Sequence, residues 1–109
     1  MIEIRSLNDY ENAITSNDAM VIMFSSDSCR DCLYAHHFMQ HVEALFKEVT
    51  FYQVKREVMP QLSIDLNIYG IPSFIVYING VVKDTWINKE RKHFDEIVRF
   101  LKKAFMERT

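Results

Sequence analysis

The stretch "AMVIMFSSDSCRDC", residues 19–32, decides how the rest of the chain is interpreted. It begins with six consecutive apolar residues, Ala19 to Phe24, a run that is typical of a strand buried on both faces. Four polar residues follow, and then come the only two cysteines of the sequence, Cys29 and Cys32. Because the chain from Arg30 to about Lys47 contains no glycine or proline, we expect a long helix that begins at or just after Cys29.

Outward from this stretch, the sequence predicts alternating strands and helices. Towards the N-terminus we expect a short strand over residues 2–4 and a helix over 7–16, with Ser6 as its N-cap. Towards the C-terminus we expect a strand over 49–54 and a short helix that begins at Pro60 and runs to about residue 66.

The last third of the chain predicts a hairpin followed by a helix. The runs "SFIVYI" and "VVKDTWI" flank Asn79-Gly80, a pair that supplies the positive φ angles of a type I′ turn. We expect Asn88 to cap the final helix. Apolar residues at helical spacing support both long helices: Leu33, Val42, Leu45 and Phe46 recur in the first, and Phe94, Ile97, Val98, Leu101 and Phe105 lie on one stripe of the second.

This order of elements predicts a single α/β domain over residues 1–109. Strands that alternate with helices and end in a hairpin indicate a central mixed sheet of about five strands, flanked by about four helices. With 49% hydrophobic residues, a chain of this length can form a core. The cysteine pair then lies at the carboxyl end of a buried strand, where α/β folds place their chemistry.

Charge and hydropathy argue against several classes of partner. The 13 basic and 15 acidic residues give a net charge of −2, so we expect no nucleic acid partner and no membrane partner. The basic C-terminal residues, Arg91 and Lys92 among them, alternate with acids, which predicts a solvated helix face. No secretory signal pattern and no apolar run of about 18 residues is present, so we expect a cytoplasmic protein. In that compartment a cysteine pair is more often catalytic or metal-binding than structural.

The spacing of the two cysteines suits thiol–disulfide exchange. A thiol at a helix start faces unpaired N–H groups, which can lower its pKa from about 8.5 to between about 3.5 and 7.5. Cys32 lies one helical turn after Cys29 and on the same side, so the two sulfurs can close into a disulfide. A second motif, "YGIPSF", places Pro72 immediately before a strand, as an ordinary turn or as a cis Ile71–Pro72 bond opposite the cysteines.

Together these motifs resemble the thioredoxin family across essentially the whole chain. The resemblance rests on the apolar strand, Cys29 and Cys32, the long helix, Gly70-Ile71-Pro72 and the Asn79-Gly80 hairpin. It implies a thioredoxin-like fold and a disulfide oxidoreductase that needs no cofactor besides its own redox-active Cys29–Cys32 disulfide. Disulfide-containing proteins or small thiols would be the substrates of this monomer, and a reductase or another thiol donor would restore it.

The resemblance also implies roles for individual residues. Cys29 would be the nucleophile and Cys32 the resolving thiol, Pro72 the cis-proline, and Ile71 would lend its backbone to a bound partner. Arg30 and Asp31, between the cysteines, would contact the substrate.

The supporting residues depart from the family pattern. The active-site string is S-C-R-D-C where the family usually has W-C-G-P-C, Met23 replaces a buried acid on the strand, and Gln53 replaces its lysine partner. We therefore consider His36, one turn after Cys32, as a substitute proton-transfer group, although a packed or solvated histidine is the better-supported explanation of a single spacing.

The charges of the loop bear on the redox direction. Asp27 and Asp31 outnumber Arg30, so the sequence predicts that the Cys29 pKa is depressed less than the helix start alone would give, as in a reductant.

Two other functions stay open. Residues 29–41 contain two Cys and three His, which suits zinc or copper, but helical spacing allows only Cys29, Cys32 and His36 to share one ion, with no fourth protein ligand. We therefore expect no metal. A thioredoxin-like domain that binds partners with little or no turnover is the other alternative, since the loop has lost its aromatic anchors.

Overall fold

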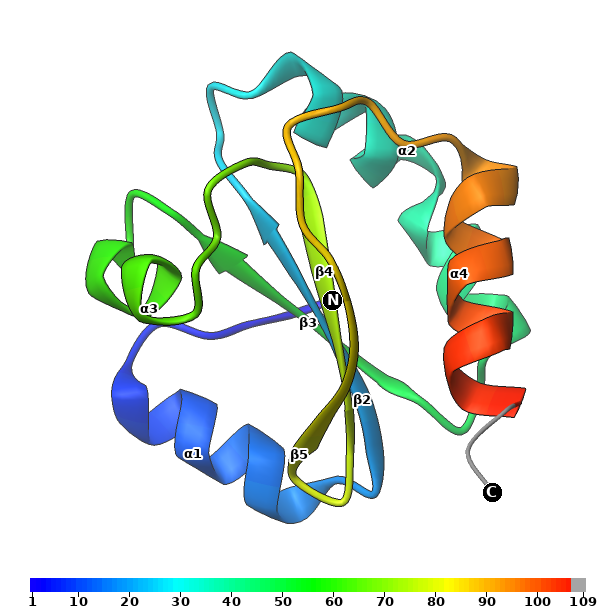
Figure 1. The fold of residues 1–109 in the computed structure, drawn as a ribbon, viewed down its shortest axis with the longest axis horizontal. Coiled ribbons are helices and arrows are strands. Elements are labelled where there is room, and N and C mark those ends of the chain that lie inside the picture. The colour runs from blue at the N-terminus through cyan, green and yellow to red at the C-terminus, as the bar shows by residue number, and fades with distance from the viewer. Residues whose placement is uncertain (107–109) are drawn as a thin grey trace.

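In the computed structural model, which describes residues 1–106, helices and strands alternate until a closing hairpin and a last helix (Figure 1). The elements are β1 (Ile2–Glu3), α1 (Leu7–Ser16), β2 (Ala19–Ser25), α2 (Arg30–Leu45), β3 (Thr50–Lys55), α3 (Pro60–Asp65), β4 (Ser73–Ile78), β5 (Val81–Trp86) and α4 (Phe94–Met106). The predicted order is confirmed, and most boundaries move by only one or two residues. None of the helices described in residues 1–106 is both long and apolar enough to cross a membrane.

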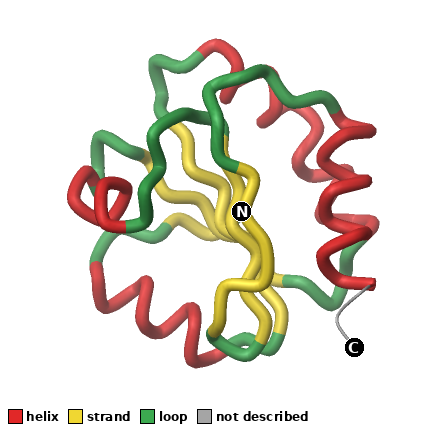
Figure 2. Tube along the Cα trace, viewed as in Figure 1, coloured by secondary structure: helices red, strands yellow, loops and turns green. Residues whose placement is uncertain are grey.

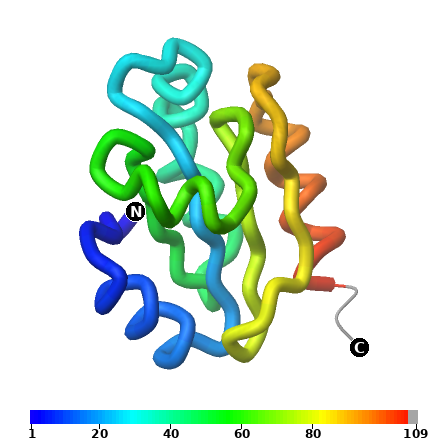
Figure 3. The backbone as a smooth tube through the Cα atoms, turned by 60° about the vertical axis from the view of Figure 1, so that its left-hand side comes forward, coloured from blue at the N-terminus to red at the C-terminus, as the bar shows by residue number. Residues whose placement is uncertain are grey.

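The strands form one five-stranded mixed sheet in the order β1-β3-β2-β4-β5 (Figure 2). β1, β2 and β3 run parallel, and β4 pairs antiparallel with both β2 and β5. Helices α1 and α3 lie on one face of the sheet, and α2 and α4 lie on the other (Figures 1 and 3). The fold class expected from the sequence is therefore confirmed.

The central strand β2 explains why its sequence is continuously apolar. All seven of its residues are buried, because helices cover the sheet on both sides. Met20, Ile22 and Phe24 belong to the core cluster shared with α1 and α3, whereas Val21 and Met23 belong to the cluster shared with α2 and α4. The period of two residues along a strand sends alternate side chains into the two cores.

Helix α2 begins where predicted and buries one face. Cys32, Ala35, Met39 and Val42 are its buried residues, at the spacing of one helical stripe. Leu33 is 51% exposed and Leu45 is 57% exposed, so these two leucines, whose spacing helped to predict the helix, lie outside its buried stripe. Because Cys32 must lie beneath the helix start, the rotation of the whole helix is set there, and Leu33 turns outward.

The hairpin has the predicted turn. Asn79 and Gly80 adopt φ angles of 53° and 78°, as a type I′ turn requires. Trp86, at the end of β5, stacks on Phe74 with ring centroids 6.1 Å apart and lies 5.3 Å from the ring of Phe100 in α4. The sole tryptophan is thus a packing residue that joins the sheet to α4.

The segment before α4 differs from the prediction. Residues 87–93, here called the strap, link β5 to α4 without helical structure, so Asn88 does not cap the last helix. Instead, the Glu96 carboxylate accepts a hydrogen bond from the backbone N–H of His93 at 3.0 Å at the true helix start. Asn88 does bind a backbone N–H two residues on, that of Glu90, at 3.0 Å. An asparagine side chain makes this kind of bond both at a helix N-cap and in an extended loop, so the sequence alone does not distinguish the two.

The strap is fastened to the loop that carries Pro72. The Ser73 hydroxyl donates to the carbonyl oxygen of Gly70 at 2.6 Å and accepts from the Asn88 N–H at 3.3 Å. The backbones meet so closely that a side chain at Gly70 would collide with the backbone of Asn88 and Lys89. Gly70 is therefore required by close approach of two chain segments.

We expect Gly70→Ala to lower the free energy of unfolding by at least about 2 kcal/mol, because backbone atoms cannot move aside as a flexible side chain can. Urea denaturation measures this change. Gly80→Asn is the control: asparagine tolerates the left-handed conformation of the turn, and its Cβ would lie 3.0 Å from the Ile14 carbonyl oxygen, a looser contact than at Gly70, so the loss should be smaller, about 1 kcal/mol. Equal losses in both variants would contradict the close-approach argument.

Candidate active site

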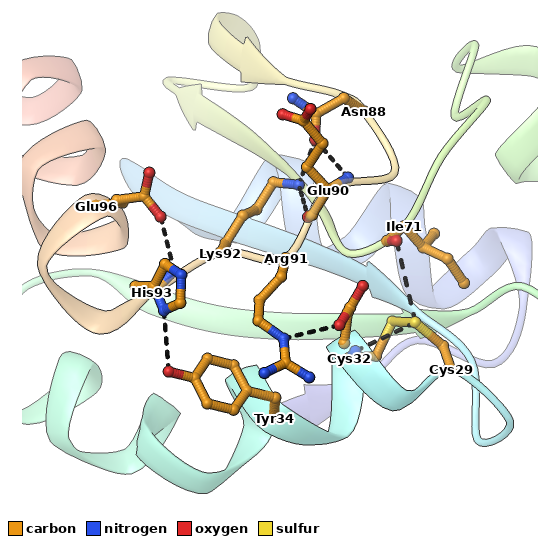
Figure 4. A network of polar contacts seen from close by, with 11 residues as sticks. Cys29, Cys32, Tyr34, Ile71, Asn88, Glu90, Arg91, Lys92, His93 and Glu96 are labelled. Atoms are coloured by element: carbon orange, nitrogen blue, oxygen red, sulfur yellow. Dashed lines mark hydrogen bonds and ion pairs between the residues drawn. A yellow bond between two sulfur atoms is a disulfide. The ribbon is translucent and has the colours of Figure 1, made fainter.

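Cys29 and Cys32 meet at the start of α2 and form a disulfide (Figure 4). Cys29 is the N-cap residue and half-buried, whereas Cys32 is 1% exposed. The Cys29 sulfur accepts a hydrogen bond from the Cys32 backbone N–H at 3.1 Å. In the reduced protein the same N–H and the helix dipole would stabilise a Cys29 thiolate. The pair thus has one accessible sulfur and one shielded sulfur.

The loop before β4 lies opposite the cysteines. The Ile71–Pro72 peptide bond is cis, and the Ile71 carbonyl oxygen lies 4.0 Å from the Cys29 sulfur (Figure 4). Tyr69 is 78% exposed beside this loop, and its hydroxyl donates to the carbonyl oxygen of Ile87 in the strap at 2.9 Å. The sequence analysis overlooked Tyr69, although its position two residues before Ile71 was a signal for it.

Each acidic residue of the loop has a basic partner from elsewhere in the chain. Asp27 pairs with Lys55 at 3.2 Å, and Asp31 pairs with Arg91 at 2.8 Å. Counted alone, Asp27, Asp31 and Arg30 predict a net acidic loop. That count was wrong, because Lys55 and Arg91 neutralise the two carboxylates. The reason is that Lys55 ends β3 and Arg91 belongs to the strap, both remote in sequence. The argument from loop charge for a weakly depressed Cys29 pKa therefore no longer holds, and the pKa itself stays a prediction.

A second contact fixes the loop on the β3 side. The Glu57 carboxylate accepts a hydrogen bond from the Asp27 backbone N–H at 2.9 Å. This bond favours the charged carboxylate and is the main reason that the pKa of Glu57 lies below its usual range. The backbone that leads into Cys29 is thus held by β3 as well as by β2.

Comparison with known proteins agrees with this geometry. A family model described as Thioredoxin matches residues 2–103. The chain belongs to the thioredoxin family. It is 20% identical over 95 residues to Thioredoxin 1 of Plasmodium falciparum, covering 87% of this chain and 91% of that protein.

Solved structures show the same fold. The crystal structure of thioredoxin from Trypanosoma brucei brucei matches with a TM-score of 0.85 at 17% identity, covering 98% of this chain and 92% of that one. A structure concerned with thiol resolution in a yeast mitochondrial 1-Cys peroxiredoxin via glutathione/thioredoxin systems matches with a TM-score of 0.79 at 16% identity, covering 92% and 94%. As a thioredoxin with a paired C-x-x-C, the protein is a thiol–disulfide oxidoreductase, a class that acts without a cofactor.

This thioredoxin lacks a carboxylate under its cysteines. Met23 is fully buried on β2, next in register to Gln53 on β3. The Gln53 side-chain oxygen lies 2.8 Å from Nε2 of His36. His36 therefore contacts Gln53, the residue next to Met23 in the sheet, whereas His41 lies further along α2.

A cleft of about 570 Å³ joins these groups to the resolving cysteine. Its lining combines polar side chains of the loop, β3 and α2 with Leu33 and Cys32: Ser25, Ser26, Asp27, Cys32, Leu33, His36, His37, Gln53 and Lys55. Cys32 and His36 therefore border the same cleft, and so does the Asp27 carboxylate that is paired with Lys55. Within residues 1–106, no group of three or more His, Cys, Asp or Glu side chains is placed to hold a metal ion.

The strap of this thioredoxin buries a lysine. Lys92 is 1% exposed, so the prediction that it lies on a solvated helix face was wrong. Its ammonium donates to Asn88 Oδ1 at 2.6 Å and to the Glu90 carbonyl oxygen at 2.9 Å (Figure 4). It also lies 5.2 Å from the ring centroid of Trp86. Burial lowers the pKa of Lys92, although Glu90, Glu96 and Asp31 act in the opposite direction.

We expect Asn88→Ala to lower the free energy of unfolding by about 2 kcal/mol, because the buried Lys92 ammonium loses one of its two oxygen acceptors. Urea denaturation with the tryptophan signal measures the change. The double variant Asn88→Ala with Lys92→Met is the matched control, and it should be more stable than Asn88→Ala because no buried charge is left. A single variant as stable as the unaltered protein would show that the bond contributes nothing.

Proposed function

We propose that this thioredoxin reduces disulfide bonds of other proteins in the cytoplasm, as a monomer, and that a reductase or another thiol donor restores it. The observation that carries the proposal is the asymmetry of the pair: Cys29 is accessible at a helix start, and Cys32 is buried behind it. An accessible attacking thiol and a shielded resolving thiol are what a net reduction of a partner requires.

In the first step, the Cys29 thiolate attacks one sulfur of the partner's disulfide. The partner's S–S bond breaks, its other sulfur leaves as a thiolate, and a mixed disulfide joins Cys29 to the partner. The Cys32 N–H, which contacts the Cys29 sulfur at 3.1 Å, stabilises the attacking thiolate before the bond forms.

In the second step, Cys32 loses its proton and attacks the Cys29 sulfur. The mixed disulfide breaks, the partner's second sulfur leaves as a thiolate, and the Cys29–Cys32 disulfide forms. With the Cα atoms 5.2 Å apart, the two residues already lie at bonding geometry. Two electrons have then passed to the partner, and two electrons from the donor's thiols restore the pair.

The partner would lie along the loop of Ile71 and Pro72. Support comes from the Ile71 carbonyl oxygen beside the Cys29 sulfur and from the exposed Arg30 at the helix start. Asp31 would contact the partner only beside its bond to Arg91, since one carboxylate oxygen is already engaged. A peroxiredoxin is one class of suitable substrate, because a protein of similar fold comes from a structural study of thiol resolution in a yeast mitochondrial 1-Cys peroxiredoxin.

We further propose that His36 accepts the proton of Cys32. The support is that His36 and Cys32 border the same cleft and that the Gln53 side-chain oxygen holds Nε2 of the imidazole ring at 2.8 Å. Since Met23 can accept no proton, the cleft is the route by which the resolving thiol loses its own.

Cys29→Ser should abolish the reduction of insulin disulfides by the protein in the presence of dithiothreitol, leaving only the rate of dithiothreitol alone. Cys32→Ser should instead accumulate a mixed disulfide with the partner, because no second thiol can resolve it. Insulin turbidity and mass spectrometry measure the two results. If Cys29→Ser is as active as the unaltered protein, the domain is a binding module and not a reductase.

His36→Ala should slow resolution of a mixed disulfide on Cys29 about tenfold, with little effect on its formation, because only the second step needs the proton acceptor. Stopped-flow kinetics with a chromogenic aromatic disulfide separates the two steps. His41→Ala is the matched control, an exposed histidine of the same helix outside the cleft. A resolution rate equal in both variants would leave His36 without a role in proton transfer.

A further inference from the structure

Two residues of the strap are bound to the first two turns of α2. The Arg91 Nε donates to Asp31 Oδ1 at 2.8 Å, and the guanidinium carbon lies 4.2 Å from the ring centroid of Tyr34 (Figure 4). The Tyr34 hydroxyl lies 2.9 Å from Nδ1 of His93. The strap and the helix that carries the cysteines are thus joined by an ion pair, a cation–π contact and a hydrogen bond.

Arg91 is held although it lies at the surface. Its side chain is 48% exposed and that of Asp31 is 36% exposed, so the ion pair alone would be weak. The ring of Tyr34, however, packs against the face of the Arg91 guanidinium. The edge of the guanidinium, through Nε, donates to the Asp31 carboxylate. A planar guanidinium can satisfy both contacts in one orientation, which an ammonium cannot.

We propose that Arg91 is a positioning residue of the redox site: it seats the strap against the start of α2 and neutralises the Asp31 carboxylate between the two cysteines. This inference rests on the proposed function and concerns how that same site is tuned. Arg91 does not touch the reacting sulfurs. It acts through Asp31 and through the strap.

The electrostatic part follows from the place of Asp31 in the helix. Asp31 lies in the first turn, where its charge is close to the N–H groups that stabilise a Cys29 thiolate. Without a partner it would oppose that thiolate. Of the other charges about Cys29, Asp27 is paired with Lys55 of β3, Glu57 is bound to the Asp27 N–H, and Lys92 of the strap is bound to Asn88. Arg30 is the exposed cation next to Cys29 on α2. Tyr69 is the titratable residue of the proline loop.

The positional part follows from the other end of the strap. There the strap is bound through Asn88 to Ser73 and through Ile87 to Tyr69, and its backbone packs against Gly70. Arg91 therefore closes a connection that runs from the proline loop, along the strap, to the start of α2. The proline loop and the strap, which both lie beside Cys29, are thereby held in one arrangement relative to α2.

The experiment measures the pH dependence of Cys29 alkylation by iodoacetamide in the reduced, full-length protein, with mass spectrometry to separate Cys29 from the buried Cys32. Arg91→Gln should raise the pKa of Cys29 by about half a unit, the size expected for a charge pair at the surface. Arg91→Lys should recover most of the shift, because it keeps the charge. Salt at about 1 M should reduce the difference, since it shortens the screening length to about 3 Å.

The control is Arg99→Gln, which removes the same charge from an exposed position of α4 and should leave the Cys29 pKa unchanged. Asp31→Asn is an independent arm and should lower the pKa, because Arg91 then acts on the thiolate unopposed. In equilibrium with glutathione, Arg91→Gln should shift the Cys29–Cys32 pair towards the disulfide by about threefold, the change in acidity that half a unit represents.

An unchanged pKa in Arg91→Gln, or the same shift in Arg99→Gln, overturns the proposal. If Arg91→Gln does not fold, Asp31→Asn decides, and a pKa that stays constant or rises overturns it. Alkylation needs no protein partner, so these results are independent of whether the protein reduces insulin.

Discussion

The hydrogen bond from the Cys32 amide to the Cys29 sulfur is the contact on which the rest of the site depends. It begins α2, fixes the rotation of that helix and leaves one sulfur accessible while the other is buried. Because Cys32 must lie inward, Leu33 and Leu45 must lie outward. The same bond that caps the helix also prepares the thiolate, so folding of the helix start and reactivity of Cys29 have one cause.

The arrangement of elements could be predicted because each signal was local. The apolar run of β2, the Asn79-Gly80 turn and the Ser6 cap each determine structure within a few residues. The capping role of Asn88 failed because its local bond to Glu90 is compatible with a helix start and with a loop, and the burial of Lys92 decides between them. That burial depends on Trp86 and on the packing of α4, which no short window of sequence contains.

The cysteines and the proline of the site were likewise accessible from the sequence, but its electrostatics were not. Lys55 and Arg91 reach Asp27 and Asp31 from positions 28 and 60 residues away. Charges counted along a loop therefore gave the wrong balance, while the geometry of His36 and Gln53, from α2 and β3, emerged only from the fold. In this domain the residues around the cysteines differ from the family pattern. Ion pairs and hydrogen bonds between elements that are distant in sequence surround the cysteines instead, and a short motif does not specify them.

The position of the single indole ring has a practical consequence. Trp86 lies between Phe74 and Phe100 with an ammonium near its face, in the core between the sheet and helices α2 and α4, and not in the cysteine loop, where the family usually places a tryptophan. Its fluorescence therefore reports how the hairpin and the last helix fit together. Because that ammonium belongs to the strap, which Arg91 binds to the start of α2, the same fluorescence is also a probe of the segment beside the redox pair.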